Sequence, residues 1–416
     1  MPDERGVVRE IAWRDCFPWL RLFDTLRLSL KLRMLVPAVV GVLLSLFGWW
    51  LIGRVFSGSE DPRLKAWIAS YASCPWEAGD ANGLNRLSSS IGPGGPFDPA
   101  TIGEFPAGAS PLASAWWTLS APARQLFDLR LTYVGLAYLL LCLFWGVAVW
   151  ALFGGALSRM AAMQLGREES IGWSKAFAYA RTKWTSYFSA PLLPLVGVLL
   201  TALPMALAGL LLRGGSVGAL VAAIAWPLLL AGGALMVVFL VGLCFGWPLM
   251  WAAISTEGTD NFDALSRSYS YVYQRPLKYL GYAVVATLLS VLGGAVALGL
   301  TEAVVHLTNW AAGWGAGQPV DDIIATGRQA EGFASWGPSI IWFWNGCVRL
   351  AALGFVYSYF WTATSAIYLL LRQDVDGTEH DEVYVDDGGE AFGMPALAKD
   401  EAGVPVVADE EAETPS

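Results

Sequence analysis

Three ionisable side chains lie within, or directly next to, stretches of the sequence that are otherwise apolar. Arg349 lies about nine residues into one such run, with Asn345 one helical turn before it, and Glu302 and His306 lie four residues apart near the end of the preceding run. Ionisable residues in a membrane span mark substrate or ion pathways, or they pair with one another. If the two runs form an antiparallel hairpin, Arg349 approaches Glu302, the one acid in the run 279–305. We predict a candidate intramembrane polar site at these four residues. A structural ion pair is the more common use of such groups, and a substrate or proton site is the alternative.

The rest of the sequence lacks the spacing that catalytic or metal sites need. The chain has two histidines, His306 and His380, and five scattered cysteines without a C-x-x-C pair. Metal sites and disulfide frameworks use clustered His or Cys residues. We therefore predict no catalytic residue, no cofactor, no metal and no enzymatic activity. The absence of a concentrated basic patch also argues against a nucleic-acid partner.

The elements that must position Arg349 and Glu302 are apolar helices. Of 416 residues, 55% are hydrophobic and 15% are charged, whereas soluble domains carry about 25% charged residues. A bilayer core needs roughly 20 apolar residues per helix, and backbone groups in lipid must be satisfied internally. We predict an all-α integral membrane protein with about six transmembrane helices. The apolar runs are 34–53, 131–157, 191–212, 229–254, 279–305 and 340–371.

The fourth run is longer than a membrane span if it is counted from Val217. A helix from Val217 to Ile254 would be about 57 Å long at 1.5 Å per residue. We expect a break at Pro227, or at Gly232 and Gly233, with residues 217–227 at the interface or re-entering the membrane.

Within that run, Gly242 and Gly246 form a G-x-x-x-G pattern. In an apolar span this pattern lets another helix approach closely. Packing inside the monomer is the favoured use, and a homo-oligomer is the alternative.

The distribution of Lys and Arg indicates the orientation. With the N-terminus inside, the inner segments hold 15 of these residues and the longer outer segments hold 8. The excess favours both termini in the cytoplasm of a multi-pass protein of the cell inner membrane. The predicted parts are a cytoplasmic amphipathic segment 1–33, a six-span domain 34–371 with an outer loop 54–130, and a cytoplasmic tail 372–416.

The tail is acidic. After Arg372 the chain holds 14 acidic residues and one basic residue. The segment lacks hydrophobic periodicity, so we predict that it is disordered. It suits a basic protein partner, although a purely solubilising role fits equally well.

An amphipathic helix is expected before the fifth span. Phe262, Leu265, Tyr269 and Val272 would form its apolar stripe, and Asp263 precedes Arg267 by the four residues that favour a helical ion pair. Similar segments precede the first and third spans. These three cytoplasmic helices are interpreted as structural elbows, or else as a surface that senses lipid or docks a partner.

A short part of this region resembles a known group of proteins. Residues 252–268, which include Glu257, Ala264, Leu265 and Arg267, are similar to a segment of uncharacterised bacterial multi-pass inner-membrane proteins, and to the membrane domain fused to some glycerophosphodiester phosphodiesterases. Residues 154–160 resemble the same group. The resemblance implies a six-helix bundle in a bacterial inner membrane, and it implies no activity because the soluble catalytic barrel is lacking.

We therefore expect a non-enzymatic membrane scaffold or accessory protein that contacts membrane lipid and recruits a basic partner. The alternative is a small-solute or lipid transporter with a polar site near Arg349.

Overall fold

The computed structural model describes residues 17–71, 110–128, 131–385, 398–399 and 405–406. The predicted segment 1–33, outer loop 54–130 and tail 372–416 therefore lie partly outside the described residues. The chain divides into two units, Met1–Val383 and Tyr384–Ser416. In the second unit, β1 (Ala398–Lys399) pairs antiparallel with β2 (Pro405–Val406).

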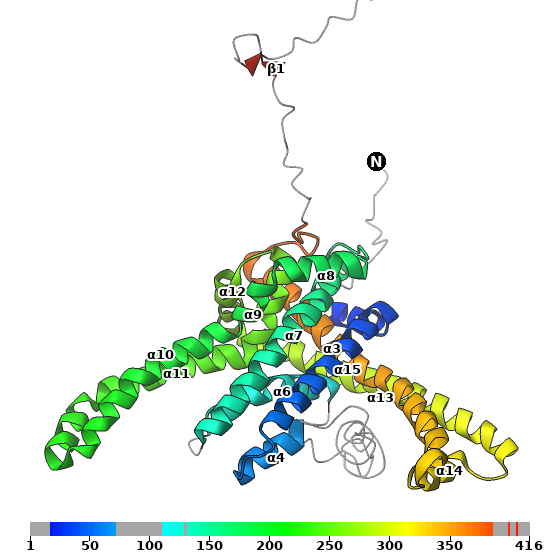
Figure 1. Cartoon of the computed structure of the whole chain (residues 1–416). Coiled ribbons are helices and arrows are strands. Elements are labelled where there is room, and N and C mark those ends of the chain that lie inside the picture. The colour runs from blue at the N-terminus through cyan, green and yellow to red at the C-terminus, as the bar shows by residue number, and fades with distance from the viewer. Residues whose placement is uncertain (1–16, 72–109, 129–130, 386–397, 400–404, 407–416) are drawn as a thin grey trace, which may run out of the picture. The chain divides into compact units, whose positions relative to one another are not determined.

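The predicted fold class is confirmed: the protein is an all-α membrane protein. Six helices in the described part of the chain are long and apolar enough to cross a membrane. They are α3 (Leu32–Val55), α7 (Tyr133–Gly166), α10 (Leu192–Gly209), α11 (Gly215–Glu257), α13 (Pro276–Ala316) and α15 (Trp336–Asp376) (Figure 1).

Shorter helices connect these six. Two of them precede α3, and the others lie between consecutive long helices. They are η1 (Pro18–Arg21), α2 (Leu22–Ser29), α4 (Pro62–Tyr71), α6 (Pro111–Gln125), α8 (Trp173–Thr182), α9 (Trp184–Ser189), η2 (Leu210–Arg213), α12 (Asn261–Gln274), α14 (Val320–Arg328) and η3 (Gly332–Ser335).

The predicted break in the fourth span is wrong. Helix α11 runs without interruption for 43 residues and contains Pro227, Gly232 and Gly233. A proline removes one backbone hydrogen bond and can kink a helix without ending it. Helix α10 lies beside α11 (Figure 1), and Gly232 faces the Met205 side chain of α10. This neighbour packs against α11 five residues after Pro227.

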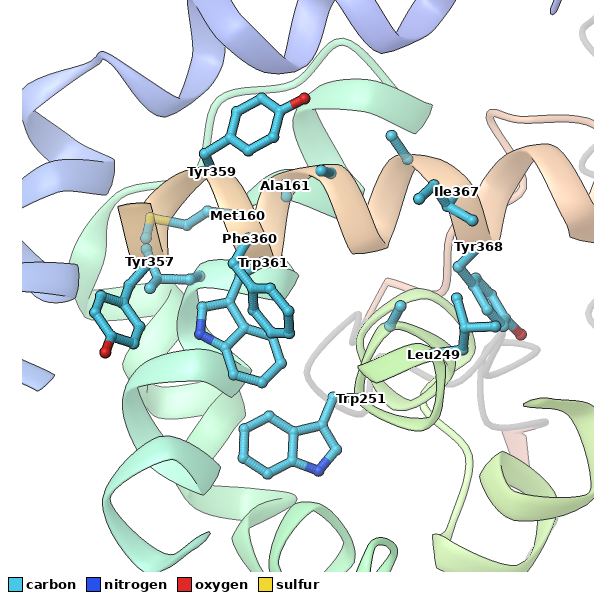
Figure 2. Close-up of a cluster of buried hydrophobic side chains, with 14 of the residues drawn as sticks. Met160, Ala161, Leu249, Trp251, Tyr357, Tyr359, Phe360, Trp361, Ile367 and Tyr368 are labelled. Atoms are coloured by element: carbon cyan, nitrogen blue, oxygen red, sulfur yellow. The ribbon is translucent and has the colours of Figure 1, made fainter. Parts of the chain in front are cut away.

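The main core lies where α3, α7, α11 and α15 come together. The indoles of Trp251 and Trp361 stack with their ring centroids 4.6 Å apart and an interplanar angle of 9°. Both side chains project into the same interior region (Figure 2). A Cβ atom on Gly154 would lie 2.8 Å from each of these indoles. Helix α7 can therefore approach the stack only because it carries a glycine there.

Helix α6 is inserted into the bundle, although the sequence places it in the outer loop. Its Trp116 Nε1 donates a hydrogen bond of 3.1 Å to the carbonyl of Cys244 in α11, and its Leu112 amide donates one of 3.4 Å to the Ser290 hydroxyl in α13. Cys244 and Ser290 each lie roughly 20 Å along their helices from the ends that adjoin α12. Ala115 of α6 is fully buried.

The helices α2, α8, α9 and α12 gather at one end of the bundle, which we call the α12 end. Helix α2 contacts α15, α8 contacts α7, and α12 contacts α9, α11, α13 and α15. Helices α11 and α15 finish at this end, each followed by a glycine with positive φ, Gly258 and Gly377. A glycine adopts this left-handed backbone conformation without steric cost, so both helices stop and the chain turns back toward the bundle.

Candidate functional site

Arg349 and Glu302 meet across the hairpin that α13 and α15 form. The Arg349 Nε and Nη2 atoms donate hydrogen bonds of 2.7 and 2.9 Å to the two carboxylate oxygens of Glu302. Each side chain is 36% exposed. The planar guanidinium and the carboxylate match in this two-point arrangement, which is the strongest form of such a pair.

A line of polar side chains continues from this pair toward α14. The Asn345 amide donates to Asn309 Oδ1 at 3.4 Å, and the Asn309 amide donates to Asp321 Oδ1 at 2.8 Å. Asn309 is buried, whereas His306 is exposed on α13. Asn309 and Asp321 were missed from the sequence. The available signal was spacing, because Asn309 lies two helical turns after Glu302 and Asn345 lies one turn before Arg349.

The chemistry available at this site is that of a closed ion pair. Both carboxylate oxygens of Glu302 accept from the one guanidinium, so a charged solute would have to displace one partner from the other. An isolated charge in a low-dielectric setting is costly, so the pair resists separation. The arrangement holds α13 to α15.

A second polar cluster lies at the α12 end and is centred on Glu257, whose side chain is 7% exposed. Its carboxylate lies 2.9 Å from Arg267 Nη1 and 3.2 Å from Arg372 Nε. The Tyr368 hydroxyl donates a 2.5 Å hydrogen bond to the same carboxylate. One acid at the end of α11 therefore joins α12 to α15.

Two acids of the predicted tail 372–416, Asp374 and Asp376, belong to the end of α15 and lie at this cluster. Asp376 lies 3.7 Å from Arg267 and accepts a hydrogen bond from the Tyr271 hydroxyl. Burial, followed by this hydrogen bond and the charge of Asp376, raises the pKa of Tyr271 above its ordinary value, so the hydroxyl stays a neutral donor. Asp374 pairs with Arg275 and Lys278. The first unit of the chain accordingly extends to Val383.

Two details expected of α12 need correction. Arg267 pairs with Glu257 and Asp376 instead of Asp263, which is exposed and whose amide donates to the Asp260 side chain at the helix N-cap. The predicted apolar stripe is correct for Leu265, Tyr269 and Val272, which are buried or pack against the core, and wrong for Phe262, which is 65% exposed. The buried face also includes Ala264, which is fully buried. Long-range charge and packing outweigh the local helical spacing here.

Gly242 and Gly246 of α11 lie against α12 of the same chain. A Cβ on Gly242 would clash with the Tyr269 ring, and one on Gly246 would lie 3.5 Å from the Ser268 hydroxyl. The Tyr269 hydroxyl donates a 2.6 Å hydrogen bond to the Phe239 carbonyl, one turn away. The G-x-x-x-G surface is thus covered within the monomer.

Arg159 is a buried charge that sequence reasoning passed over. It is 5% exposed, its Nη1 donates a 2.7 Å hydrogen bond to the Ser255 carbonyl, and its guanidinium lies 4.2 Å from the Tyr179 ring centroid. The Tyr179 hydroxyl in turn donates to the Ile254 carbonyl. The sequence contains little signal, because Arg159 lies two residues after the predicted apolar run 131–157, where a basic residue is expected to face the cytoplasm. Its role is to join α7, α8 and α11.

In the described residues, no group of three or more His, Cys, Asp and Glu side chains is placed to hold a metal ion. No family model, no curated protein and no solved structure matches this chain.

Proposed function

We propose that this chain is a non-enzymatic scaffold or accessory protein of a bacterial inner membrane, with both termini in the cytoplasm and an acidic tail that recruits a basic protein. The observation that carries the proposal is the division of the acidic C-terminal segment. Asp374 and Asp376 pair with basic residues of α12 and α13, whereas residues 384–416 hold nine acidic residues and one basic residue.

The chain is attached to the helix bundle directly before the acid-rich segment 384–416. Arg372, which pairs with Glu257, also donates a 2.7 Å hydrogen bond to the Glu382 carbonyl. The chain is therefore tied to the bundle just before the acid-rich residues begin. A negatively charged segment attached in this way attracts a basic partner over about 10 Å at moderate salt.

The orientation and family relation belong to the same proposal. The excess of Lys and Arg in the predicted inner segments supports a cytoplasmic α12 end. The relation to the uncharacterised bacterial membrane proteins rests on residues 252–268, where Glu257 and Arg267 form their ion pair.

The test replaces the nine acidic residues of 384–416 with Asn and Gln and keeps the length. The matched control shuffles the order of residues 384–416 and keeps their charge. Proteins crosslinked to each variant in the native membrane are quantified by mass spectrometry. We expect basic partners to be lost from the neutralised tail and kept by the shuffled one. Equal recovery of the same proteins with the neutralised tail would refute the proposal.

A small-solute or lipid transporter is the second candidate, favoured by the polar line from Arg349 and Glu302 to Asn309. For protons the test uses liposomes that contain a pH-sensitive dye and wild-type protein or Glu302→Gln. Proton entry that Glu302→Gln abolishes would favour transport. Entry equal to that of empty liposomes would exclude proton transport at this site.

A further inference from the structure

Three basic residues lie together where α2 leads into α3. Arg27 is exposed in the last turn of α2, Lys31 is the N-cap residue of α3, and Arg33 lies in the first turn of α3. We call these residues the α2–α3 cluster. Partial burial of its side chain, followed by the charges of Arg33 and Arg27, lowers the pKa of Lys31 below its ordinary value. The cations of the cluster are therefore close enough to repel one another.

Acidic side chains do not relieve this repulsion. Other cations at the α12 end pair with acids of α11 or α15, and these are Arg267, Arg275, Lys278 and Arg372. Within the part of the chain that the structure describes, neither Arg27 nor Lys31 forms an ion pair with an acidic residue. Arg33 donates to the side chain of Gln164 in α7, which is neutral. Positive charge is therefore in excess at the start of the first span.

The turn that carries the cluster is held in place by other helices. Ser29 is fully buried, and its carbonyl accepts a 2.9 Å hydrogen bond from the Ser358 hydroxyl of α15. On the other side of Lys31, the Arg33 carbonyl accepts a 2.8 Å hydrogen bond from the Trp173 indole of α8. The backbone is thus fixed both before and after Lys31. A site that is ordered before its ligand arrives loses less entropy on binding.

The start of α3 adds further positive charge to the cluster. The helix begins without a side-chain cap and without an acidic residue in its first turn. The positive end of its dipole is therefore not offset by its own residues, and it acts in the same direction as the cations.

Apolar side chains flank the central cation of the cluster. Lys31 lies between Leu30, which is 39% exposed, and Leu32, which is 75% exposed. Leu32 begins a transmembrane helix, so the cluster lies at the boundary between the apolar span and the polar headgroups. Cations directly beside exposed leucines suit a ligand in which an anionic group is joined to hydrocarbon chains.

We propose that the α2–α3 cluster binds the headgroup of an anionic glycerophospholipid. Arg27 and Lys31 contact the lipid phosphate, Arg33 adds its charge from behind, and the acyl chains lie along Leu30 and Leu32. Basic residues directly outside a membrane span attract anionic lipid in this way. Free phosphate has the same charge but no chain to contact the leucines, so the occupant is a lipid. The proposal rests on neither the acidic tail nor its partner.

The first experiment removes the two cations that contact the phosphate. Delipidated full-length protein is titrated with dioleoyl phosphatidylglycerol, and bound lipid is counted by native mass spectrometry. The double variant Arg27→Gln with Lys31→Gln is compared with Lys175→Gln with Arg181→Gln, which removes two exposed cations of α8 at the same end. We expect about fivefold weaker binding for each charge of the cluster, and about 25-fold for the double variant. The α8 variant should lose below about twofold, and equal losses in both would overturn the proposal.

Two further titrations identify the ligand. Dioleoyl phosphatidylcholine has no net charge, and we expect its binding to be weaker than that of phosphatidylglycerol and unchanged by the double variant. Glycerol 3-phosphate has the phosphate without acyl chains, and a large excess should not displace phosphatidylglycerol. Displacement by glycerol 3-phosphate would show that the cluster binds a soluble phosphate ester and would refute the lipid assignment.

The conservative replacement separates charge from folding. Lys31→Arg keeps the positive charge, so this variant should bind phosphatidylglycerol as the wild-type protein does, whereas Lys31→Gln should bind about fivefold more weakly. Equal losses in Lys31→Arg and Lys31→Gln would contradict a role for the charge.

A last measurement needs no variant. The wild-type protein is placed in nanodiscs of phosphatidylglycerol or of phosphatidylcholine, and its lysines are acetylated and quantified by mass spectrometry. A bound phosphate covers the Lys31 amine and favours its unreactive charged form. We therefore expect Lys31 to react more slowly in phosphatidylglycerol than in phosphatidylcholine, and by a larger factor than Lys175 does. An equal change at the two lysines, or none at Lys31, would overturn the proposal.

Discussion

Arg349 and Glu302 are 47 residues apart in the chain, and their side chains meet through two parallel hydrogen bonds of 2.7 and 2.9 Å. An antiparallel hairpin of apolar helices brings them to the same level. Because each charge satisfies the other, the pair holds α13 and α15 together where neither helix alone would tolerate the charge.

Removing one member of this pair should destabilise the protein. Arg349→Met leaves the Glu302 carboxylate without its cation, and we expect a loss of about 2 kcal/mol, at the low end of the range because both side chains are partly exposed. The double variant Arg349→Met with Glu302→Gln should recover most of this loss. Thermal unfolding in detergent measures both, with the exposed His306→Ala as the control. A double variant as unstable as Arg349→Met would contradict a pairwise role.

Glu257 should matter more than any other acid at the α12 end. Glu257→Gln leaves two cations, Arg267 and Arg372, without the carboxylate between them, and a loss of about 3 kcal/mol is expected. Asp263→Asn on the exposed face of α12 should cost below about 1 kcal/mol. Comparing the two by thermal unfolding also decides which acid stabilises Arg267. Equal effects would mean that the helical spacing, and not the tertiary contact, governs its pairing.

The close approach of α11 and α12 requires the absence of a side chain at Gly242. Gly242→Ala places a methyl group against the Tyr269 ring, and we expect a loss of about 1–3 kcal/mol from overpacking. Gly233→Ala on the same helix has open space, and it should be neutral or slightly stabilising. Unfolding curves and native mass spectra of both variants provide the measurement. If Gly242→Ala changes only the oligomeric state, the glycine surface faces a second copy of the chain.

Arg159 should not tolerate its usual conservative replacement. Arg159→Lys keeps the charge and loses the planar stacking over Tyr179 and the fixed direction of the bond to the Ser255 carbonyl. We expect a loss of about 1–2 kcal/mol. Arg167→Lys is the control, because Arg167 forms an exposed ion pair with Glu169. This variant should change the stability little. Matching unfolding temperatures for the two variants would show that Arg159 contributes only its charge.

Hydropathy located all six long helices, because the number of consecutive apolar residues that a membrane span needs is visible in the local sequence. The sequence also indicated the approach of Arg349 to Glu302, since two consecutive antiparallel helices leave few acids within reach. It predicted a break in α11 that the structure does not have, because the packing of α10 against that helix cannot be read from composition.

Only the tertiary structure decided how the remaining residues meet. Arg267 pairs with Glu257 and Asp376 because the ends of α11 and α15 converge on α12, whereas the spacing within α12 alone favoured Asp263. Helix α6 enters the bundle through contacts with Cys244 and Ser290, far away in the sequence. The indoles of Trp251 and Trp361 stack because α11 and α15 come together in the core. Local hydrophobicity fixes which segments become helices, but the lowest-energy pairing of charges and donors depends on which helices become neighbours.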